Sequence, residues 1–345
     1  MRAVIYTGPN EVALADVPVP ALTEPTDAIV KVALAGICGT DLHVIRGDFP
    51  GIEPGTVLGH EFVGEVVEAG RDVRRVRQGD KVMASDFSAC GHCAWCERRA
   101  HWHCQQRGFF GTGVSFGPAL GGAQAEYVRV PHADTTLGLL PAGCSTDAAL
   151  LMGDNLATGW AAIERARVEP GECVVVIGGG AVGQLTALAA GVVIVVEPNP
   201  ARRAFAQAHG SLAAHPDEAP ALLRRLAQDG TEPGGDVVIE AVGGNGPLDL
   251  ALQLAGPLGR VVSVGTHAAE QWAFPVGRAF RDELSVSFAI GDAIRLRSRL
   301  LRLIAGGAFD PSVVIDTRGS LDDVPRLYQR LAAQEFLKAV VSPLR

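Results

Sequence analysis

Apolar and polar residues alternate in short runs up to about residue 150, and Gly, Pro and Asp interrupt these runs. Two clear examples are AIVKVALAG at 28–36 and EFVGEVVEAG at 61–70. Alternation with a period of two is typical of strands that bury one face. This part of the chain is therefore predicted to be mainly β.

The pattern changes near residue 155, where continuous apolar runs begin to alternate with helix-like segments. The apolar runs are 173–178, 237–243 and 260–265. The helix-like segments include 200–208 and 247–255. Strands without a polar face, separated by helices, are typical of a parallel sheet that is covered on both sides. A doubly wound α/β sheet is predicted here.

The last part of the chain contains an arginine-rich amphipathic helix at 294–305, a second helix after Leu321 and a closing strand, KAVVSP. We find no repeat, low-complexity tract or long polar linker, so a compact hinge is expected near the change of pattern. The prediction is a mainly β domain at 1–155, a doubly wound domain at 156–290, and a segment at 291–345 that returns to the first domain.

Composition changes this picture little. The 345 residues exceed what one hydrophobic core usually serves, and 48% hydrophobic with 20% charged residues is ordinary for a folded protein. A net charge of −8 disfavours nucleic acids and anionic membranes as partners. The start, MRAVIYTGPN, lacks the apolar stretch of a signal peptide, so a cytoplasmic location is expected. The uncharged run 173–196 could span a bilayer, but β-branched blocks around a glycine turn favour a strand–helix–strand unit.

Four of the seven cysteines stand close together, at Cys90, Cys93, Cys96 and Cys104. An odd total and this clustering fit metal binding better than a disulfide framework. Four thiolates complete a tetrahedral zinc shell and leave no position for a substrate, so a structural zinc is predicted, with free or redox thiols as the alternative. Three nearby histidines could each replace a cysteine but are expected to be solvated loop residues; they are His92, His101 and His103.

A second set of candidate ligands is dispersed: Cys38 in GICGTD, His60 in GHE and Asp154 in MGDN. None is persuasive alone, because a single cysteine is usually a core residue and a single histidine usually lies on a surface. Together, one thiolate, one imidazole and one carboxylate are the three protein ligands that leave a zinc position open for water or a substrate oxygen. Asp41 could orient the His60 ring by accepting from its second nitrogen.

The segment GGGAVG follows an apolar strand and precedes a helix-like segment. In a βαβ unit Gly178 would make the tight turn, Gly180 would let the backbone approach a pyrophosphate and Gly183 would allow close helix packing. Glu197 ends the next apolar strand, where its carboxylate would accept from the ribose hydroxyls and repel a 2′-phosphate. NAD is therefore favoured over NADP, although Arg202 could accept a phosphate.

The order GICGTDLH, GHE, CxxCxxCx7C, a late Asp and GGGAVG resembles the zinc-dependent medium-chain alcohol dehydrogenase family over essentially the whole chain. This resemblance implies a GroES-like mainly β domain, a Rossmann domain, two zinc ions per chain, hydride transfer between an alcohol and NAD, and a homodimer or homotetramer. GGAQAEYVRVPHADTTL and LLMGDNLATG most resemble the branch related to formaldehyde dehydrogenases, which suggests an aldehyde–thiol adduct as substrate. Secondary alcohol and polyol dehydrogenases are the alternative.

The resemblance also assigns roles to residues. The three dispersed ligands would hold a catalytic zinc, and Glu61 matches a carboxylate that can swing onto it. Thr40 and His43 match the hydroxyl and the imidazole of a proton relay. Val182 matches a backbone amide that faces the pyrophosphate, and Val264 to Thr266 match the strand end that grips the nicotinamide carboxamide.

One departure from the family is the spacing of Gly183 and Glu197, which is fourteen positions and several fewer than usual. A helix over 181–190 would extend about 15 Å, whereas the crossover has to run back along a strand of about 17–20 Å. Either the helix is truncated or the sequence lacks residues here, and the second interpretation is favoured. A break or irregular backbone is predicted between Ala190 and Val192.

Two other classes of protein are the alternatives. A shortened helix would favour a non-catalytic nucleotide-binding relative, and the wider superfamily contains zinc-free quinone and enoyl reductases. The set of candidate ligands and relay residues disfavours both. Trp160 and Phe110 are candidate substrate walls, with core packing as the favoured interpretation, and 283–290 is predicted to be an edge strand that could pair across a twofold axis.

Overall fold

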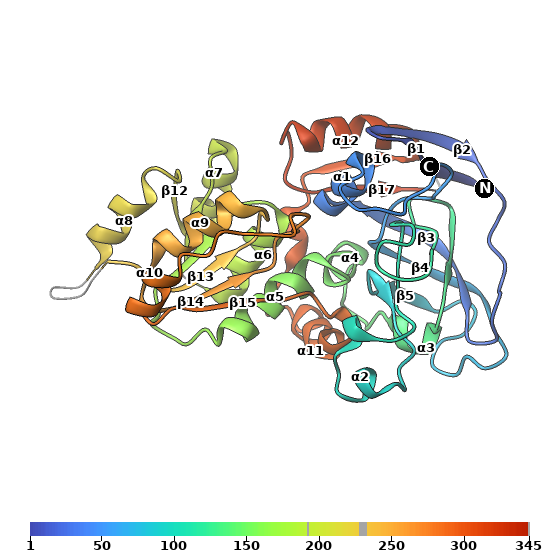
Figure 1. Ribbon diagram of the computed structural model, residues 1–345. Coiled ribbons are helices and arrows are strands. Elements are labelled where there is room, and N and C mark those ends of the chain that lie inside the picture. The colour runs from blue at the N-terminus through green and yellow to red at the C-terminus, as the bar shows by residue number, and fades with distance from the viewer. Residues whose placement is uncertain (192, 228–232, 344–345) are drawn as a thin grey trace. The chain divides into compact units, whose positions relative to one another are not determined.

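The computed structural model describes residues 1–191, 193–227 and 233–343, and the chain divides into two units (Figure 1). Unit 1 consists of Met1–Ala157 together with Asp292–Arg345, and unit 2 consists of Thr158–Gly291. Unit 2 is therefore an insertion between two segments that fold together.

Unit 1 contains most of the short strands that the alternating pattern predicts. Its strands are β1 Arg2–Gly8, β2 Glu11–Asp16, β3 Ala28–Ile37, β4 Phe62–Ala69, β5 Lys81–Ala84, β6 Phe87–Ser88, β7 Gly108–Phe109, β8 Tyr127–Val130, β9 Leu137–Leu139, β16 Thr317–Ser320 and β17 Ala339–Ser342. Its helices are α1 Gly39–Arg46, α2 Ala94–Glu97, α3 Ala133–Thr136, α4 Thr146–Met152, α11 Ala293–Ala305 and α12 Val324–Ala332, with 3-10 turns at His101–His103, Pro311–Val314 and Leu321–Asp323. Helix α5, Asn155–Ala166, begins in unit 1 and continues into unit 2.

The largest sheet of unit 1 joins the two ends of the sequence. Its strand order is β16-β17-β3-β4-β5-β9, and β8 also pairs with β3. Strand β17 lies antiparallel to β3, with Ala339 opposite Ile37. The residue before β17 and the residue after β3 are consequently brought to the same place in the sheet.

Unit 2 is an alternating series of strands and helices. Its elements are β10 Val174–Ile177, α6 Ala181–Ala190, β11 Ile194–Val196, α7 Pro200–Ala208, β12 Leu212–Ala214, α8 Ala219–Leu226, β13 Gly235–Glu240, α9 Asn245–Leu254, β14 Ala255–Ser263, α10 Val276–Arg281 and β15 Ser285–Phe288. All the strand pairs are parallel, in the order β12-β11-β10-β13-β14-β15. The predicted doubly wound sheet is confirmed.

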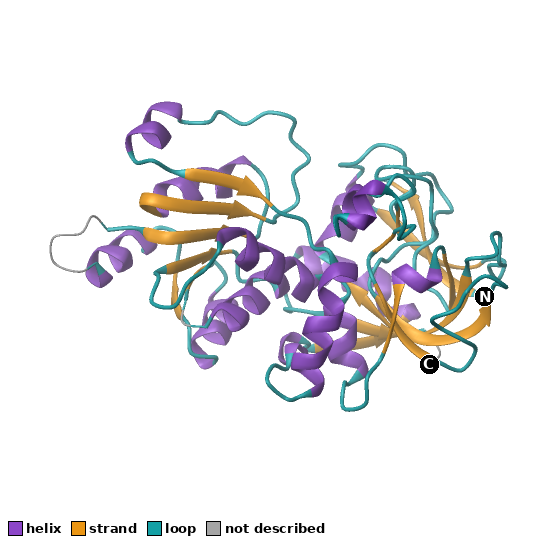
Figure 2. Cartoon of the chain, turned by 90° about the horizontal axis from the view of Figure 1, so that it is seen from below, coloured by secondary structure: helices purple, strands orange, loops and turns teal. Residues whose placement is uncertain are grey.

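Both faces of this parallel sheet are buried, because successive side chains of a strand point to opposite sides. Along β10, Val175 and Ile177 pack with residues of α8 and α9, whereas Val174 and Val176 pack with residues of α5, α6 and α7. Figure 2 shows helices on both sides of these strands. The continuous apolar run of the sequence is explained by this arrangement.

Several single elements of unit 2 lie at or near the predicted residues. The helices predicted at 181–190 and 200–208 are α6 and α7, and the predicted strand 283–290 is β15, at an edge of its sheet among the described residues. Pairing of that edge with a second chain stays a prediction. The strand predicted at 237–243 ends earlier, at Glu240, whose side-chain Oε1 accepts from the backbone N–H groups of Val242 and Gly243. No described helix combines the length and the apolar character needed to cross a membrane.

The expected irregularity after Ala190 falls partly outside the described residues. Helix α6 ends at Ala190, and Gly191 has a φ of 91°, in the region that favours glycine. Val192 lies outside the described part of the chain.

Helix α6 approaches the sheet most closely at Gly183, where a Cβ atom would lie 1.8 Å from the carbonyl oxygen of Gly178. We expect Gly183→Ala to lower the free energy of unfolding by about 1–3 kcal/mol, because a backbone atom cannot move aside as a side chain can. Gly180→Ala is the matched control, since a Cβ there would meet no atom within 4 Å. Urea unfolding of both variants tests this, and equal midpoints would contradict the close packing.

Candidate functional site

The dispersed candidate ligands lie at the ends of neighbouring elements of unit 1. Cys38 follows β3 and is the N-cap of α1, and its backbone N–H donates to Oδ2 of Asp41 at 3.0 Å. His60 and Glu61 immediately precede β4, which pairs with β3. Asp154 lies between α4 and α5. The pairing of β3 with β4 and the turn between α4 and α5 bring side chains from three parts of the sequence next to one another.

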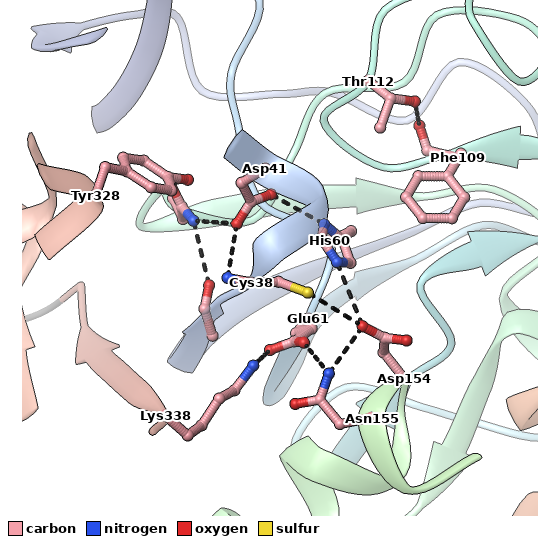
Figure 3. A network of polar contacts seen from close by, with 12 residues as sticks. Cys38, Asp41, His60, Glu61, Phe109, Thr112, Asp154, Asn155, Tyr328 and Lys338 are labelled. Atoms are coloured by element: carbon pink, nitrogen blue, oxygen red, sulfur yellow. Dashed lines mark hydrogen bonds and ion pairs between the residues drawn. The ribbon is translucent and has the colours of Figure 1, made fainter. Parts of the chain in front are cut away.

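Four predicted residues form one buried cluster (Figure 3). Cys38, His60, Glu61 and Asp154 each offer a ligand atom within 4.8 Å of the others. Oδ2 of Asp154 lies 3.6 Å from Sγ of Cys38 and 3.4 Å from Nε2 of His60. The His60 ring is 1% exposed, and neither of its nitrogens makes an aligned hydrogen bond. A thiol, a carboxylate and a buried imidazole with an unsatisfied nitrogen are a donor set that fits zinc.

Burial and mutual charge shift the pKa of each of these groups. Burial, with the charges of Glu61 and Asp154, raises the pKa of the Cys38 thiol to about 11. Burial opposes the charging of His60, but the charges of Asp41 and Cys38 together with the contact to Asp154 outweigh it and raise the imidazole pKa well above 6.5. For Asp154, the hydrogen bond and charge of His60 outweigh burial and hold the pKa below its ordinary value. A cation at the cluster would favour the thiolate form of Cys38.

Asp41 lies next to the His60 ring, as predicted, but the two do not form an aligned hydrogen bond. Oδ1 of Asp41 lies 3.0 Å from Nδ1 of His60. Such a carboxylate holds a ligating imidazole by one nitrogen, so that the other can face a metal. In Figure 3 the ring of His60 stands between Asp41 and Asp154.

Two further residues of the cluster are absent from the sequence-based prediction. Nζ of Lys338 pairs with Oε2 of Glu61, and both side chains are buried. Nδ2 of Asn155 donates to Oε1 of Glu61 at 2.7 Å and to Asp154 at 3.0 Å. Burial lowers the pKa of Lys338, but the charges of Glu61 and Cys38 outweigh it and the net shift is upward. In the sequence, Lys338 is only a single charge in front of an apolar strand, and this position does not show which residue it pairs with.

The two predicted relay residues lie in α1. Thr40 is two residues beyond Cys38, and His43 is three positions further, on the same side of the helix. Nδ1 of His43 lies 2.7 Å from Oδ2 of Asp48, a partner that the sequence did not suggest. The imidazole is therefore held through Nδ1, which leaves Nε2 for a second partner.

The four clustered cysteines converge on one point in the lobe that carries α2. Their sulfur atoms lie within 4.8 Å of one another, with separations of 3.5 Å for Cys90–Cys104, 3.6 Å for Cys93–Cys96 and 3.9 Å for Cys90–Cys96. A tetrahedron with Zn–S bonds of about 2.3 Å has edges of about 3.8 Å. Backbone N–H groups of Gln105 and Cys96 lower the pKa of Cys93 to about 6. The arrangement fits a closed four-sulfur metal shell.

The nearby histidines stay outside this sulfur cluster. His92 and His103 are exposed, as expected. The expectation of a solvated loop residue is wrong for His101, which is buried with its backbone N–H 3.0 Å and its Nδ1 3.1 Å from oxygens of Asp292. Asp292 also caps α11 by accepting from the N–H of Arg295, so this residue ties the cysteine lobe to the start of that helix.

The predicted nucleotide-binding residues of unit 2 gather at the carboxyl ends of its strands. Gly178 follows β10 with a φ of 95°, and Gly183 and Val182 lie in the first turn of α6. Glu197 follows β11, where its carboxylate accepts from the N–H of Gly179 at 2.7 Å. The segment Val264–Thr266 follows β14 and touches the loop after β13, since a Cβ at Gly243 would lie 2.0 Å from O of Thr266.

Other predicted residues of unit 2 and of the substrate wall have clear positions. The space around the Cβ position of Gly180 is open to 4 Å, so a ligand could approach the backbone there. A guanidinium nitrogen of Arg202 lies 4.0 Å from Glu197. Phe110 is fully buried against Phe62, with ring centroids 5.1 Å apart, so its role is core packing.

Comparison with known proteins decides the family. Residues 24–141 match the alcohol dehydrogenase GroES-like domain, and residues 176–306 match the zinc-binding dehydrogenase domain. The "Probable zinc-binding alcohol dehydrogenase" of Mycobacterium tuberculosis is 38% identical, covering 97% of this chain and 86% of that protein. The chain belongs to the zinc-binding alcohol dehydrogenase family. The resemblance deduced from the motifs is thereby confirmed.

Two further relatives of this alcohol dehydrogenase agree along almost the whole chain. The structure of the alcohol dehydrogenase TADH from Thermus sp. ATN1 is similar with a TM-score of 0.92 and 34% identity, covering 99% of each chain. The glutathione-independent formaldehyde dehydrogenase of Pseudomonas aeruginosa is 32% identical, covering 99% of this chain and 97% of that one. The similarity to formaldehyde dehydrogenases that the sequence motifs suggested is therefore also found in this comparison.

In this alcohol dehydrogenase, we expect Lys338→Met to lower the free energy of unfolding by about 3–5 kcal/mol, because Glu61 is left as a buried charge without its cation. The double variant Lys338→Met with Glu61→Gln removes both charges and is expected to regain part of this loss. Denaturant unfolding of the single and double variants measures the difference. A double variant as unstable as the single one would show that the ion pair is not the cause.

Proposed function

We propose that this alcohol dehydrogenase transfers a hydride between an alcohol, or an aldehyde–thiol adduct, and NAD, with one catalytic and one structural zinc per chain. The observation that carries the proposal is the convergence of Cys38, His60 and Asp154 in a buried cluster. The second support is the four-sulfur cluster, whose closed shell leaves no position for a substrate.

Three side chains would hold the catalytic zinc: Cys38 through Sγ, His60 through Nε2 and Asp154 through a carboxylate oxygen. The oxygens of Glu61 pair with Lys338 and Asn155, so Glu61 would have to leave these partners to swing onto the metal as a fourth ligand. Three protein ligands leave a coordination position for a substrate oxygen. Zinc held in this way supplies the Lewis acidity that lowers the pKa of an alcohol hydroxyl.

The proton of the alcohol is moved by side chains of α1 in this proposal. Thr40 Oγ1 would take part as a hydroxyl relay close to the cluster, and His43 would accept the proton at Nε2. Asp48, 2.7 Å from Nδ1, would stabilise the imidazolium that results. The side chain of His43 is 26% exposed, so it can pass the proton to water.

The dinucleotide would lie along the carboxyl ends of the strands of unit 2. Backbone of Gly180 and the N–H of Val182 would face the pyrophosphate, and Val264–Thr266 would hold the carboxamide. Each oxygen of Glu197 accepts one backbone N–H, from Gly179 or Asn199, and retains lone pairs for ribose hydroxyls. Its negative charge disfavours a 2′-phosphate, which supports NAD over NADP.

We expect the purified protein to contain two zinc ions per chain and Cys38→Ser to retain only the ion of the four-cysteine cluster. Mutation of a residue that only hydrogen-bonds a metal ligand typically lowers metal affinity or activity by about 10–100-fold. Loss of the ligand Cys38 itself should therefore lower turnover by more than about 100-fold, while the fold and NAD binding are retained. Metal analysis and alcohol-dependent NAD reduction measure this. Cys144→Ser, outside both clusters, is the control. Two zinc ions and normal turnover in Cys38→Ser would remove the metal assignment.

Cofactor choice is tested by two variants with opposite expectations. Glu197→Gln removes the charge that repels a 2′-phosphate, so the ratio of kcat/KM for NAD to that for NADP should fall about tenfold, equivalent to about 1.4 kcal/mol. Arg202→Ala should raise the same ratio, because the cation next to that position is lost. Steady-state kinetics with both dinucleotides gives the ratios, and an unchanged ratio in Glu197→Gln would contradict the proposed role.

The substrate class is tested by comparing formaldehyde with and without an added thiol, secondary alcohols and polyols in the same assay. The formaldehyde dehydrogenase relative makes formaldehyde the first choice.

A further inference from the structure

We propose that Tyr328, in α12, is a positioning residue for the candidate metal ligand His60. Its effect passes through two buried side chains, Gln124 and Asp41. The inference rests on the proposed function, since it concerns the zinc that His60 would bind. Tyr328 follows His60 far along the sequence, and α12 brings it next to Asp41 (Figure 3).

The first step is the hydrogen bond between Tyr328 and Gln124. Oη of Tyr328 donates to Oε1 of Gln124 at 2.7 Å. Nε2 of Gln124 donates to O of Gly36 at 3.2 Å and to Oδ2 of Asp41 at 3.4 Å. Because the amide nitrogen faces two acceptors, the amide has one favourable orientation, and its oxygen must accept from the phenol. Tyr328 therefore holds the amide that donates to Asp41.

The second step is the orientation of Asp41. Its Oδ2 atom accepts from the N–H of Cys38 at 3.0 Å and from Gln124, and its Oδ1 atom lies 3.0 Å from Nδ1 of His60. Two donors on one oxygen set the plane of the carboxylate, so the other oxygen is presented to the imidazole. A proton on Nδ1 of His60 then leaves the lone pair of Nε2 directed at the cluster.

Burial makes this chain of contacts effective. Gln124, Asp41 and His60 are all nearly inaccessible, so water does not replace a lost donor as it would at a surface. The Tyr328 ring belongs to the hydrophobic core of unit 1, where a phenylalanine would fill almost the same space. The hydroxyl is thus the part of Tyr328 that serves His60, and Tyr328→Phe removes that part alone.

The experiment compares zinc affinity at the two clusters of the full-length protein, by competition with a chromophoric chelator. In Tyr328→Phe, the affinity of the cluster containing His60 should fall by about tenfold. The four-cysteine cluster of the same molecule should be unchanged, which makes it an internal reference. Tyr6→Phe is the matched control, because Tyr6 and Tyr328 are both 4% exposed in the same core and Tyr6 lies outside this chain of contacts.

A spectroscopic measurement separates positioning from general destabilisation. After replacement of zinc by cobalt, the d–d bands of the cluster containing His60 should shift in Tyr328→Phe and not in Tyr6→Phe. If Tyr328→Phe fails to fold, Gln124→Met, which removes the donor to Asp41, has to show the same selective loss of affinity.

The outcomes distinguish the inference from the proposed function. Unchanged affinity and unchanged cobalt bands in Tyr328→Phe overturn the inference, while two zinc ions in the wild-type protein leave the proposed function standing. A wild-type protein that binds zinc only at the four-cysteine cluster overturns both. Equal weakening at both clusters also overturns the inference, since it would reflect loss of stability.

Discussion

The burial of several ionisable groups around one point is the constraint on which the rest of unit 1 depends. Glu61 is buried beside Asp154 and Cys38, and the basic groups that face these acidic side chains are the buried His60 and Lys338. A buried charge without a partner costs several kcal/mol, so the ionised side chains of this cluster need partners at hydrogen-bonding distance. The pairing of β3 with both β4 and β17 meets that requirement, because Cys38 follows β3 while Glu61 and Lys338 precede the two antiparallel neighbours, at the same end of the paired strands.

The features that could be predicted from the sequence are those whose residues are close together or repeat with a fixed period. The continuous apolar runs of unit 2 reflect burial of both faces of its sheet, so a doubly wound fold could be deduced from them. The four cysteines lie within fifteen positions, and their spacing alone suggests a common ion. The dispersed set of Cys38, His60 and Asp154 became persuasive only as a combination, and the structure brings these three residues together.

The residues that escaped prediction are those whose partners are chosen by tertiary structure. Lys338 is a single charge in front of an apolar strand, and nothing local shows that the pairing of β17 with β3 buries it against Glu61. His101 was expected to be a solvated loop residue, whereas it is buried against Asp292, which lies 191 positions away in the sequence. Tyr328 likewise belongs to an amphipathic helix with no sign of a polar partner inside the core. A buried polar side chain needs a partner, but the sequence does not say which one.

The insertion of unit 2 has a consequence for biosynthesis. Unit 2 is continuous in sequence, so all its described strands are synthesised before Asp292 is added to the chain. Unit 1 is different, because Glu61 is translated early and the ammonium that neutralises it arrives only when residue 338 emerges. Until then Glu61 lacks the ammonium group with which it pairs in the folded protein. Unit 2 can therefore fold before synthesis ends, whereas the ion pair of Glu61 can form only after residue 338 has been added.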